Sequence, residues 1–131
     1  MITAANLRMM ARARLTDARA LLKTKRYDGA IYIGGYVVEI ALKARICRTL
    51  RWPGFPESRT EFQSLASFKT HDLDTLLRLS GREPRIKANH LAEWSAIATW
   101  DPEVRYKLPG TAKKTDVDLF LKAAEVLLTA I

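Results

Sequence analysis

The two histidines, His71 and His90, are the residues of this chain best suited to acid–base chemistry, because imidazole titrates near neutral pH. His71 stands at the start of an expected helix, where it fits a capping arrangement better than a base. His90 shares the expected apolar face of a later helix with Trp94 and Ile97, which is typical of a buried core histidine. No carboxylate stands at ligand spacing from either histidine, so we expect no metal site.

Basic side chains recur along the expected first helix at spacings that place them on one face. That stripe consists of Arg8, Arg12, Arg19 and Lys23, with Arg26 added only if the helix extends that far. Residues 1–51 carry 11 basic and 3 acidic side chains, and residues 52–131 carry 11 of each, so the whole net charge of +8 lies in the first part. Such a stripe can follow a phosphate backbone, which makes a polyanion a reasonable partner. A solvated helix face is the alternative.

The expected second helix is apolar around most of its circumference, except for one narrow polar strip. Tyr32, Tyr36, Glu39 and Lys43 form this strip, within about 60° of one another. The strip fits a cleft or a dimer interface in which the tyrosines stack on a base or donate hydrogen bonds. It also fits a satisfied polar seam, with the glutamate and the lysine paired and the tyrosines half exposed.

Hydrophobic periodicity predicts helices and no convincing strand. The expected helices span residues 4–23, 29–50, 70–79, 84–100 and 115–131, and their N-terminal signals are Thr3, Asp28, Thr70, Pro84 and Thr115. The pattern predicts an all-α antiparallel bundle of four to five helices, with residues 1–131 as a single domain. Gly34 and Gly35 lie within the second helix, where each costs up to about 1 kcal/mol relative to alanine. We therefore expect a neighbouring helix or a partner subunit to approach the backbone closely there.

Composition narrows the class of protein further. The chain has 131 residues, 48% of them hydrophobic and 27% charged, which is typical of a globular domain and not of a disordered one. A single cysteine, Cys47, excludes an internal disulfide and a multi-thiolate metal site, and it fits a reducing, cytoplasmic compartment. No apolar run reaches the ~18 residues of a membrane span, and no secretion signal is recognisable. We expect no cofactor and no membrane partner.

Three segments of the chain together resemble one known family of helical domains. Residues 26–44, from Arg-Tyr-Asp-Gly-Ala-Ile-Tyr through Gly-Gly-Tyr-Val-Val-Glu, resemble the second helix of that family. Residues 70–77, with Thr-His-Asp-Leu and a following Leu-Leu, resemble its next helix. Trp100 followed by Arg105 and Tyr106 resembles the signature near its end. These segments together resemble HEPN domains. The resemblance implies a helical bundle that usually dimerises, association with a nucleotide or RNA, and often a nucleotidyltransferase partner in a toxin–antitoxin pair.

The resemblance also implies candidate functional residues. Many HEPN proteins are metal-independent ribonucleases in which an arginine precedes a histidine by a few residues, and Arg85 and His90 have that order. The histidine would move a proton of the 2′-hydroxyl or the leaving oxygen, while the arginine would stabilise charge at phosphorus. The branch with an Arg-Tyr signature binds nucleotides, and there Arg105 would contact a phosphate and Tyr106 would stack.

Three hypotheses about function follow from the sequence. The preferred one is a dimeric module that binds a nucleotide or RNA through the basic stripe, the polar strip of the second helix and the Arg-Tyr pair. The second is a metal-independent ribonuclease. The third is an interaction module whose basic stripe docks on an acidic face of a partner protein, with no affinity for RNA.

Overall fold

The computed structural model describes all of residues 1–131 and confirms the all-α prediction, with six α-helices, two short 3-10 helices and no strand. The elements in chain order are α1 (Ala4–Lys23), α2 (Tyr27–Leu50), η1 (Ala66–Phe68), α3 (Leu73–Ser80), α4 (Glu83–Asn89), α5 (Leu91–Ile97), η2 (Pro102–Tyr106) and α6 (Lys114–Ala130). None of these helices combines the length and the apolar character that crossing a membrane requires.

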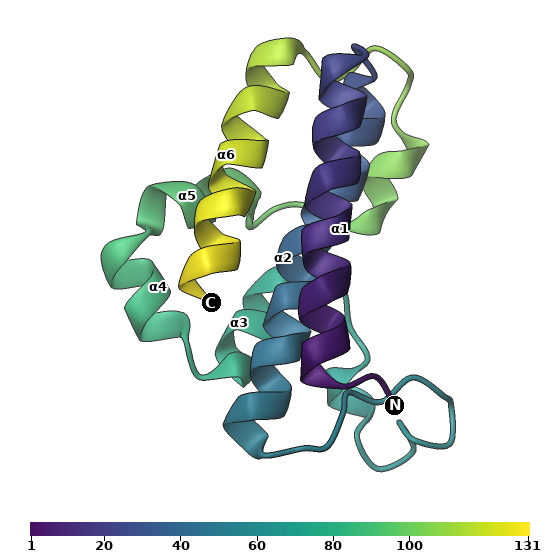
Figure 1. Cartoon of the computed structure of the whole chain (residues 1–131), viewed down its shortest axis with the longest axis vertical. Helices are drawn as coiled ribbons and strands as arrows, with labels where there is room; N and C mark the ends of the chain where they lie inside the picture. Colours follow the sequence, from purple (N-terminus) through teal and green to yellow (C-terminus); the bar gives the residue numbers. More distant parts are fainter.

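The two long helices form an antiparallel pair on which the other elements pack (Figure 1). α2 lies at the centre of the molecule because it is apolar nearly all round, and it contacts α1, α3, α6 and η2. The C-terminal helix α6 covers α2 and α5 and also touches α1. The short helices α3, α4 and α5 form the remaining side, and the buried apolar side chains make one continuous core.

The two glycines of α2 are explained by packing within the chain. A Cβ atom added to Gly35 would lie 1.9 Å from Cε2 of the Trp100 ring, and one added to Gly34 would lie 2.7 Å from Cδ2 of Leu121. Both distances are shorter than any real carbon contact, so only glycine lets Trp100 and α6 approach the α2 backbone. No partner subunit is needed to account for these residues.

Several predicted helix boundaries are shifted. α2 begins at Tyr27 with Arg26 as its N-cap, so Asp28 lies in the first turn and does not cap it. The N-cap of α3 is Asp72, whose Oδ2 accepts from the backbone N–H of Thr75 at 2.9 Å, and the predicted cap at Thr70 is wrong. The last helix begins at Lys114 instead of following a cap at Thr115.

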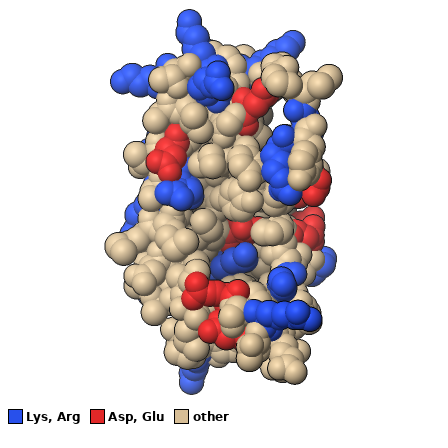
Figure 2. Space-filling view, turned by 90° about the vertical axis from the view of Figure 1, so that its right-hand side faces the viewer, with Lys and Arg blue, Asp and Glu red and all other residues tan.

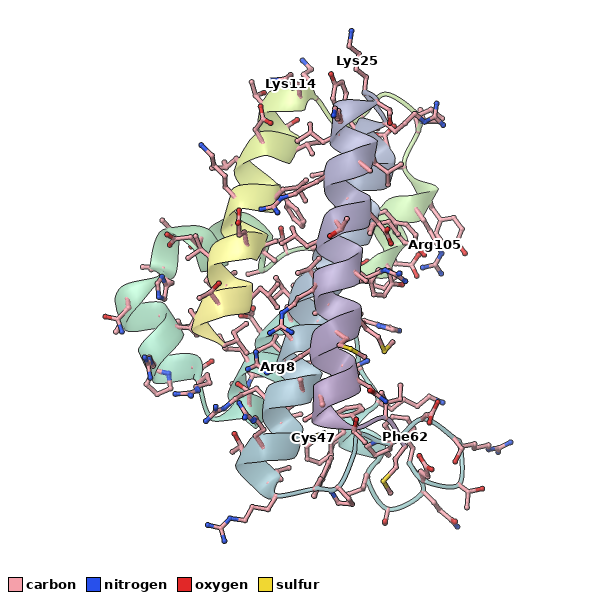
Figure 3. The ribbon with its side chains drawn as sticks, in the orientation of Figure 1. Arg8, Lys25, Cys47, Phe62, Arg105 and Lys114 are labelled. Atoms are coloured by element: carbon pink, nitrogen blue, oxygen red, sulfur yellow. The ribbon has the colours of Figure 1, made fainter.

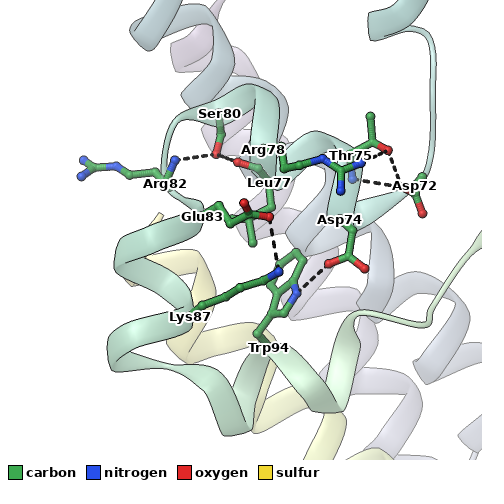
Figure 4. A network of polar contacts seen from close by, with 10 residues as sticks. All are labelled: Asp72, Asp74, Thr75, Leu77, Arg78, Ser80, Arg82, Glu83, Lys87 and Trp94. Atoms are coloured by element: carbon green, nitrogen blue, oxygen red, sulfur yellow. Dashed lines mark hydrogen bonds and ion pairs between the residues drawn. The ribbon is translucent and has the colours of Figure 1, made fainter.

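The helix predicted over residues 84–100 is broken at His90. This residue has φ −138° and ψ 37°, which ends α4 and starts α5 in a new direction. The change of direction lets Trp94 enter the core, where its Nε1–H donates to Oδ1 of Asp74 at 3.0 Å (Figure 4). His90 itself is half-buried at the junction of the two helices.

Candidate functional site

A buried carboxylate lies at the centre of the polar strip on α2. Only 3% of Glu39 is exposed, and its Oε1 accepts a hydrogen bond from Nδ1 of His71. Its Oε2 lies 3.7 Å from Nζ of Lys43, one turn later on the same helix. Both partners offset the desolvation of a carboxylate that would be costly to bury alone.

His71 therefore has a different role from the predicted one. It belongs to no cap, because Asp72 and Thr75 close the start of α3. Its ring is held by Glu39 through Nδ1, while 57% of its side chain is exposed to solvent. A histidine oriented by a buried carboxylate and open to solvent can exchange a proton with a bound ligand. Sequence reasoning missed this pair, because 32 residues separate its members.

Aromatic rings continue the strip beyond the Glu39–His71 pair. The Tyr36 ring centroid lies 6.4 Å from that of His71, 5.5 Å from that of Tyr32 and 5.0 Å from that of Trp100. Burial, with a further contribution from the neighbouring Tyr32 phenol, raises the pKa of Tyr36 to about 12. At neutral pH the Tyr36 hydroxyl is therefore protonated and can donate a hydrogen bond.

The Arg105–Tyr106 pair of η2 lies at the edge of this strip. η2 packs against α2, and the Arg105 charge acts on the Tyr36 phenol by lowering its pKa, against the larger effect of burial. Arg105 Nη1 donates to the carbonyl oxygen of Pro102 at 2.8 Å, and its guanidinium carbon lies 4.6 Å from the Tyr106 ring centroid. Tyr106 is 72% exposed. An aromatic ring this exposed, beside a fixed guanidinium, offers a stacking surface next to a phosphate ligand.

Asp28 holds the segment that follows this pair. Its Oδ2 accepts from the backbone N–H of Gly110 at 2.6 Å, and its Oδ1 accepts from that of Ala112 at 2.8 Å. These two hydrogen bonds lower the pKa of Asp28, and the one from Ala112 has the larger effect. The residue predicted to cap α2 thus anchors the loop between η2 and α6.

A pocket of about 500 Å³ opens at the other end of the strip, between the start of α1, α2 and the connection before α3. Ile40, Phe55 and Phe62 contribute apolar walls, and His71 and Lys43 also line it. Lys43 Nζ lies 5.4 Å from the Phe55 ring centroid. The pocket was not predicted, because its walls come from a connection without periodicity. The aromatic residues of that connection were the available signal, namely Trp52, Phe55, Phe62 and Phe68.

We call the surface made by these groups the α2 face; it comprises Tyr32, Tyr36, Glu39, Lys43, His71, Arg105 and Tyr106. Six of its seven members were predicted as site residues, and the structure adds His71. Figure 2 views the side of the molecule on which η2 lies and shows basic and acidic side chains interspersed there. This side therefore carries no continuous basic surface.

The other predicted residues lie elsewhere. Arg8 and Arg105 are on opposite sides of α1 (Figure 3). Arg19 forms an ion pair with Glu125 of α6, and the exposed Arg12 and Lys23 follow the same α1 stripe. The structure therefore separates the basic stripe from the α2 face.

No hydrogen bond or ion pair joins the side chains of Arg85 and His90. Arg85 is exposed on α4, and His90 is half-buried at the α4–α5 junction. No group of three or more histidine, cysteine, aspartate or glutamate side chains is arranged to hold a metal ion.

The fold and the site define an all-α bundle with a polar face centred on a buried glutamate and an exposed histidine. No family model, no curated protein and no solved structure matches the chain. Its geometry and chemistry therefore carry the functional argument.

Proposed function

We propose that the chain is a HEPN-like module that binds a nucleotide or RNA along the α2 face. The observation that carries this proposal is the Arg105–Tyr106 pair, an exposed ring with a guanidinium 4.6 Å from its centroid, beside the phenols of α2. Stacking on an aromatic ring contributes about 1–3 kcal/mol per base and tolerates any base, because every base has a π face. Arginine is suited to the adjoining phosphate, since its planar fork donates two parallel hydrogen bonds.

The pocket next to Lys43 supports the same proposal. Its volume of about 500 Å³ lies within the usual range for small-molecule sites. Its apolar and aromatic walls fit a base or a ribose, and Lys43 and Lys69 at the pocket would contact phosphates. The His71 ring, which lines the pocket, and the Tyr36 hydroxyl would bind polar groups of the ligand. A homodimer and a nucleotidyltransferase partner complete the proposal, and both rest on the family resemblance.

A binding titration with a labelled single-stranded RNA tests this proposal. We expect Tyr106→Ala and Arg105→Gln each to weaken binding about fivefold to a hundredfold, as the loss of one stacked base or one phosphate contact predicts. The matched control is Arg14→Gln, because Arg14 is an exposed arginine of α1 paired with Asp17. Affinity should also fall steeply with added salt. Equal affinities for all four proteins would show that RNA does not contact Arg105 or Tyr106 and would overturn the proposed site. No RNA binding at low salt would leave the interaction module as the function.

The Glu39–His71 pair favours RNA cleavage as a second candidate function. His71 would take the proton of a 2′-hydroxyl, and the 2′-oxygen would then attack phosphorus. The bond from phosphorus to the 5′-oxygen would break, and the 5′-oxygen would take a proton from water. The products would be a 2′,3′-cyclic phosphate and a free 5′-hydroxyl, and Arg105 would stabilise the charge at phosphorus. The sequence-based alternative assigns these roles to His90 and Arg85.

Cleavage of RNA in EDTA distinguishes the two assignments. Activity lost in His71→Ala and kept in His90→Ala would support the α2 face as the catalytic site. The reverse pattern would support Arg85 and His90. No cleavage by the folded wild-type protein would leave binding as the function.

A further inference from the structure

Five arginines from three helices gather on the molecule away from the α2 face. Burial lowers the pKa of Arg45, and the like charges of the other members lower it further. We call the group the arginine cluster; it comprises Arg8 of α1, Arg45 and Arg48 of α2, and Arg82 and Arg85 at the start of α4. Only two members were singled out by the sequence, Arg8 as part of the basic stripe and Arg85 as a candidate ribonuclease residue.

Local structure brings these residues together. Arg45 and Arg48 are three residues apart on α2 and share one side of the helix. At the end of that helix, Thr49 Oγ1 donates to the carbonyl oxygen of Ser80 at 2.7 Å, which fixes the α3–α4 turn against α2. Arg82 follows in that turn, and its backbone N–H donates to Ser80 Oγ at 3.2 Å. Figure 4 shows its side chain extending away from this network.

No acidic side chain compensates these charges. None of the five guanidinium groups forms an ion pair or a side-chain hydrogen bond, and the adjacent Glu83 pairs with Lys87 at 3.3 Å instead. The Nε atoms of Arg8, Arg45 and Arg82 are buried without a hydrogen-bond partner. Buried donors are normally paired, so three unpaired donors on arginines of one group are unusual. Burial, followed by the charges of Arg48 and Arg12, also lowers the pKa of Arg8.

We propose that the arginine cluster is a binding site for a phosphate chain, such as inorganic tripolyphosphate or the triphosphate of a nucleotide. All members are arginines, whose planar forks bind phosphate oxygens in pairs and carry their charge at any physiological pH. The side chains come from three helices and converge on one place, so they suit a compact ligand with several negative charges. This site goes beyond the proposed function, because it shares no residue with the α2 face.

Thermal unfolding with added tripolyphosphate at constant ionic strength tests the proposal. For the wild-type protein we expect Tm to rise by about 5–10 °C at 100 times Kd, since a ligand of the folded state stabilises it. The double variant Arg48→Gln with Arg85→Gln changes two exposed side chains and preserves the buried parts of the cluster. We expect it to lose affinity at least tenfold, and to have a higher Tm than wild type without ligand, because like charges are removed.

A matched variant separates this site from general electrostatics. Arg14→Gln should bind tripolyphosphate as the wild type does, since Arg14 pairs with Asp17 on α1 and does not belong to the cluster. ATP should bind with an affinity similar to that of tripolyphosphate, and orthophosphate much more weakly.

The proposal is overturned by any of three results. One is the absence of a Tm shift in the wild type, and another is an equal shift in the double variant. The third is RNA binding that depends on Arg48 and Arg85 without binding of tripolyphosphate, which would make the cluster a nucleic-acid contact. None of these results depends on whether Tyr106→Ala weakens RNA binding, so the two proposals fail separately.

Discussion

The imidazole of His71 donates its Nδ1–H to the carboxylate of Glu39, which is almost completely buried in the central helix of the bundle. One partner belongs to α2 and the other to the segment just before α3, so the pair joins the core of the fold to an exposed side chain. The same contact holds the ring orientation that acid–base chemistry would need. It therefore connects the stability of the bundle to the candidate site.

Glu39→Gln should destabilise the protein by about 1–3 kcal/mol, because the replacement keeps the shape of the side chain but removes the charged acceptor of His71 and Lys43. Urea unfolding with an unchanged m value measures this loss. Glu125→Gln is the control, since Glu125 is paired with Arg19 at the exposed surface, and it should cost less than about 1 kcal/mol. Equal losses in the two variants would contradict a structural role of the buried pair.

Gly35→Ala should cost about 3 kcal/mol or more, because the new Cβ would meet the buried Trp100 ring at about 2 Å. Gly29→Ala, in the first turn of the same helix, has 3.5 Å to the nearest atom of Leu21. It should be neutral or stabilise by up to about 1 kcal/mol through helix propensity. Thermal unfolding of both variants gives the comparison. A mild effect at Gly35 would show that Trp100 can move away from α2.

Two capping variants test the corrected start of α3. Asp72→Ala should cost about 1 kcal/mol, because Asp72 accepts from the backbone N–H of Thr75. Thr70→Ala should cost less, since Thr70 Oγ1 accepts only from the N–H of Asp72, outside the helix. Chemical denaturation of both variants measures which of them loses more stability. The opposite ranking would restore the cap predicted at Thr70.

The depressed pKa of Asp28 predicts a pH dependence of stability. In the acid range the unfolded chain binds a proton at Asp28 more readily than the folded protein, so stability rises with pH there. The contribution is fully present above the unfolded pKa of about 3.9 and is lost as pH falls through the lower folded value.

Asp28→Asn should therefore lose stability at pH 7 and approach the wild type at the lowest pH at which both fold. Unfolding free energies at several pH values measure the difference. Asp118→Asn, at a surface pair with Lys114, is the control and should show little of this trend. A constant difference between Asp28→Asn and wild type would mean that the carboxylate charge does not hold the Gly110 loop.

Much of the bundle was predictable from local pattern alone. The bounds of α1 agree with the prediction, including the cap at Thr3, because apolar spacing and a capping hydroxyl act within a few residues of one another. The end of α3 at Ser80 lies one residue beyond the predicted end at residue 79, and Gly81 stops the helix there because glycine readily adopts its φ of 75°. The break at His90 was not predicted, because the burial of Trp94 that stabilises it involves residues that are distant in the sequence.

The sequence by itself determined that the chain is helical, that α2 is the central element, and that a tyrosine, glutamate and lysine strip runs along it, because helical periodicity depends only on residue order. Tertiary structure decided which groups meet that strip. Glu39 pairs with His71 and Arg45 lies among arginines of α1 and α4, because packing forces that act between elements set these neighbours. Residue spacing along the chain carries no record of such contacts, and both proposed sites are built from them.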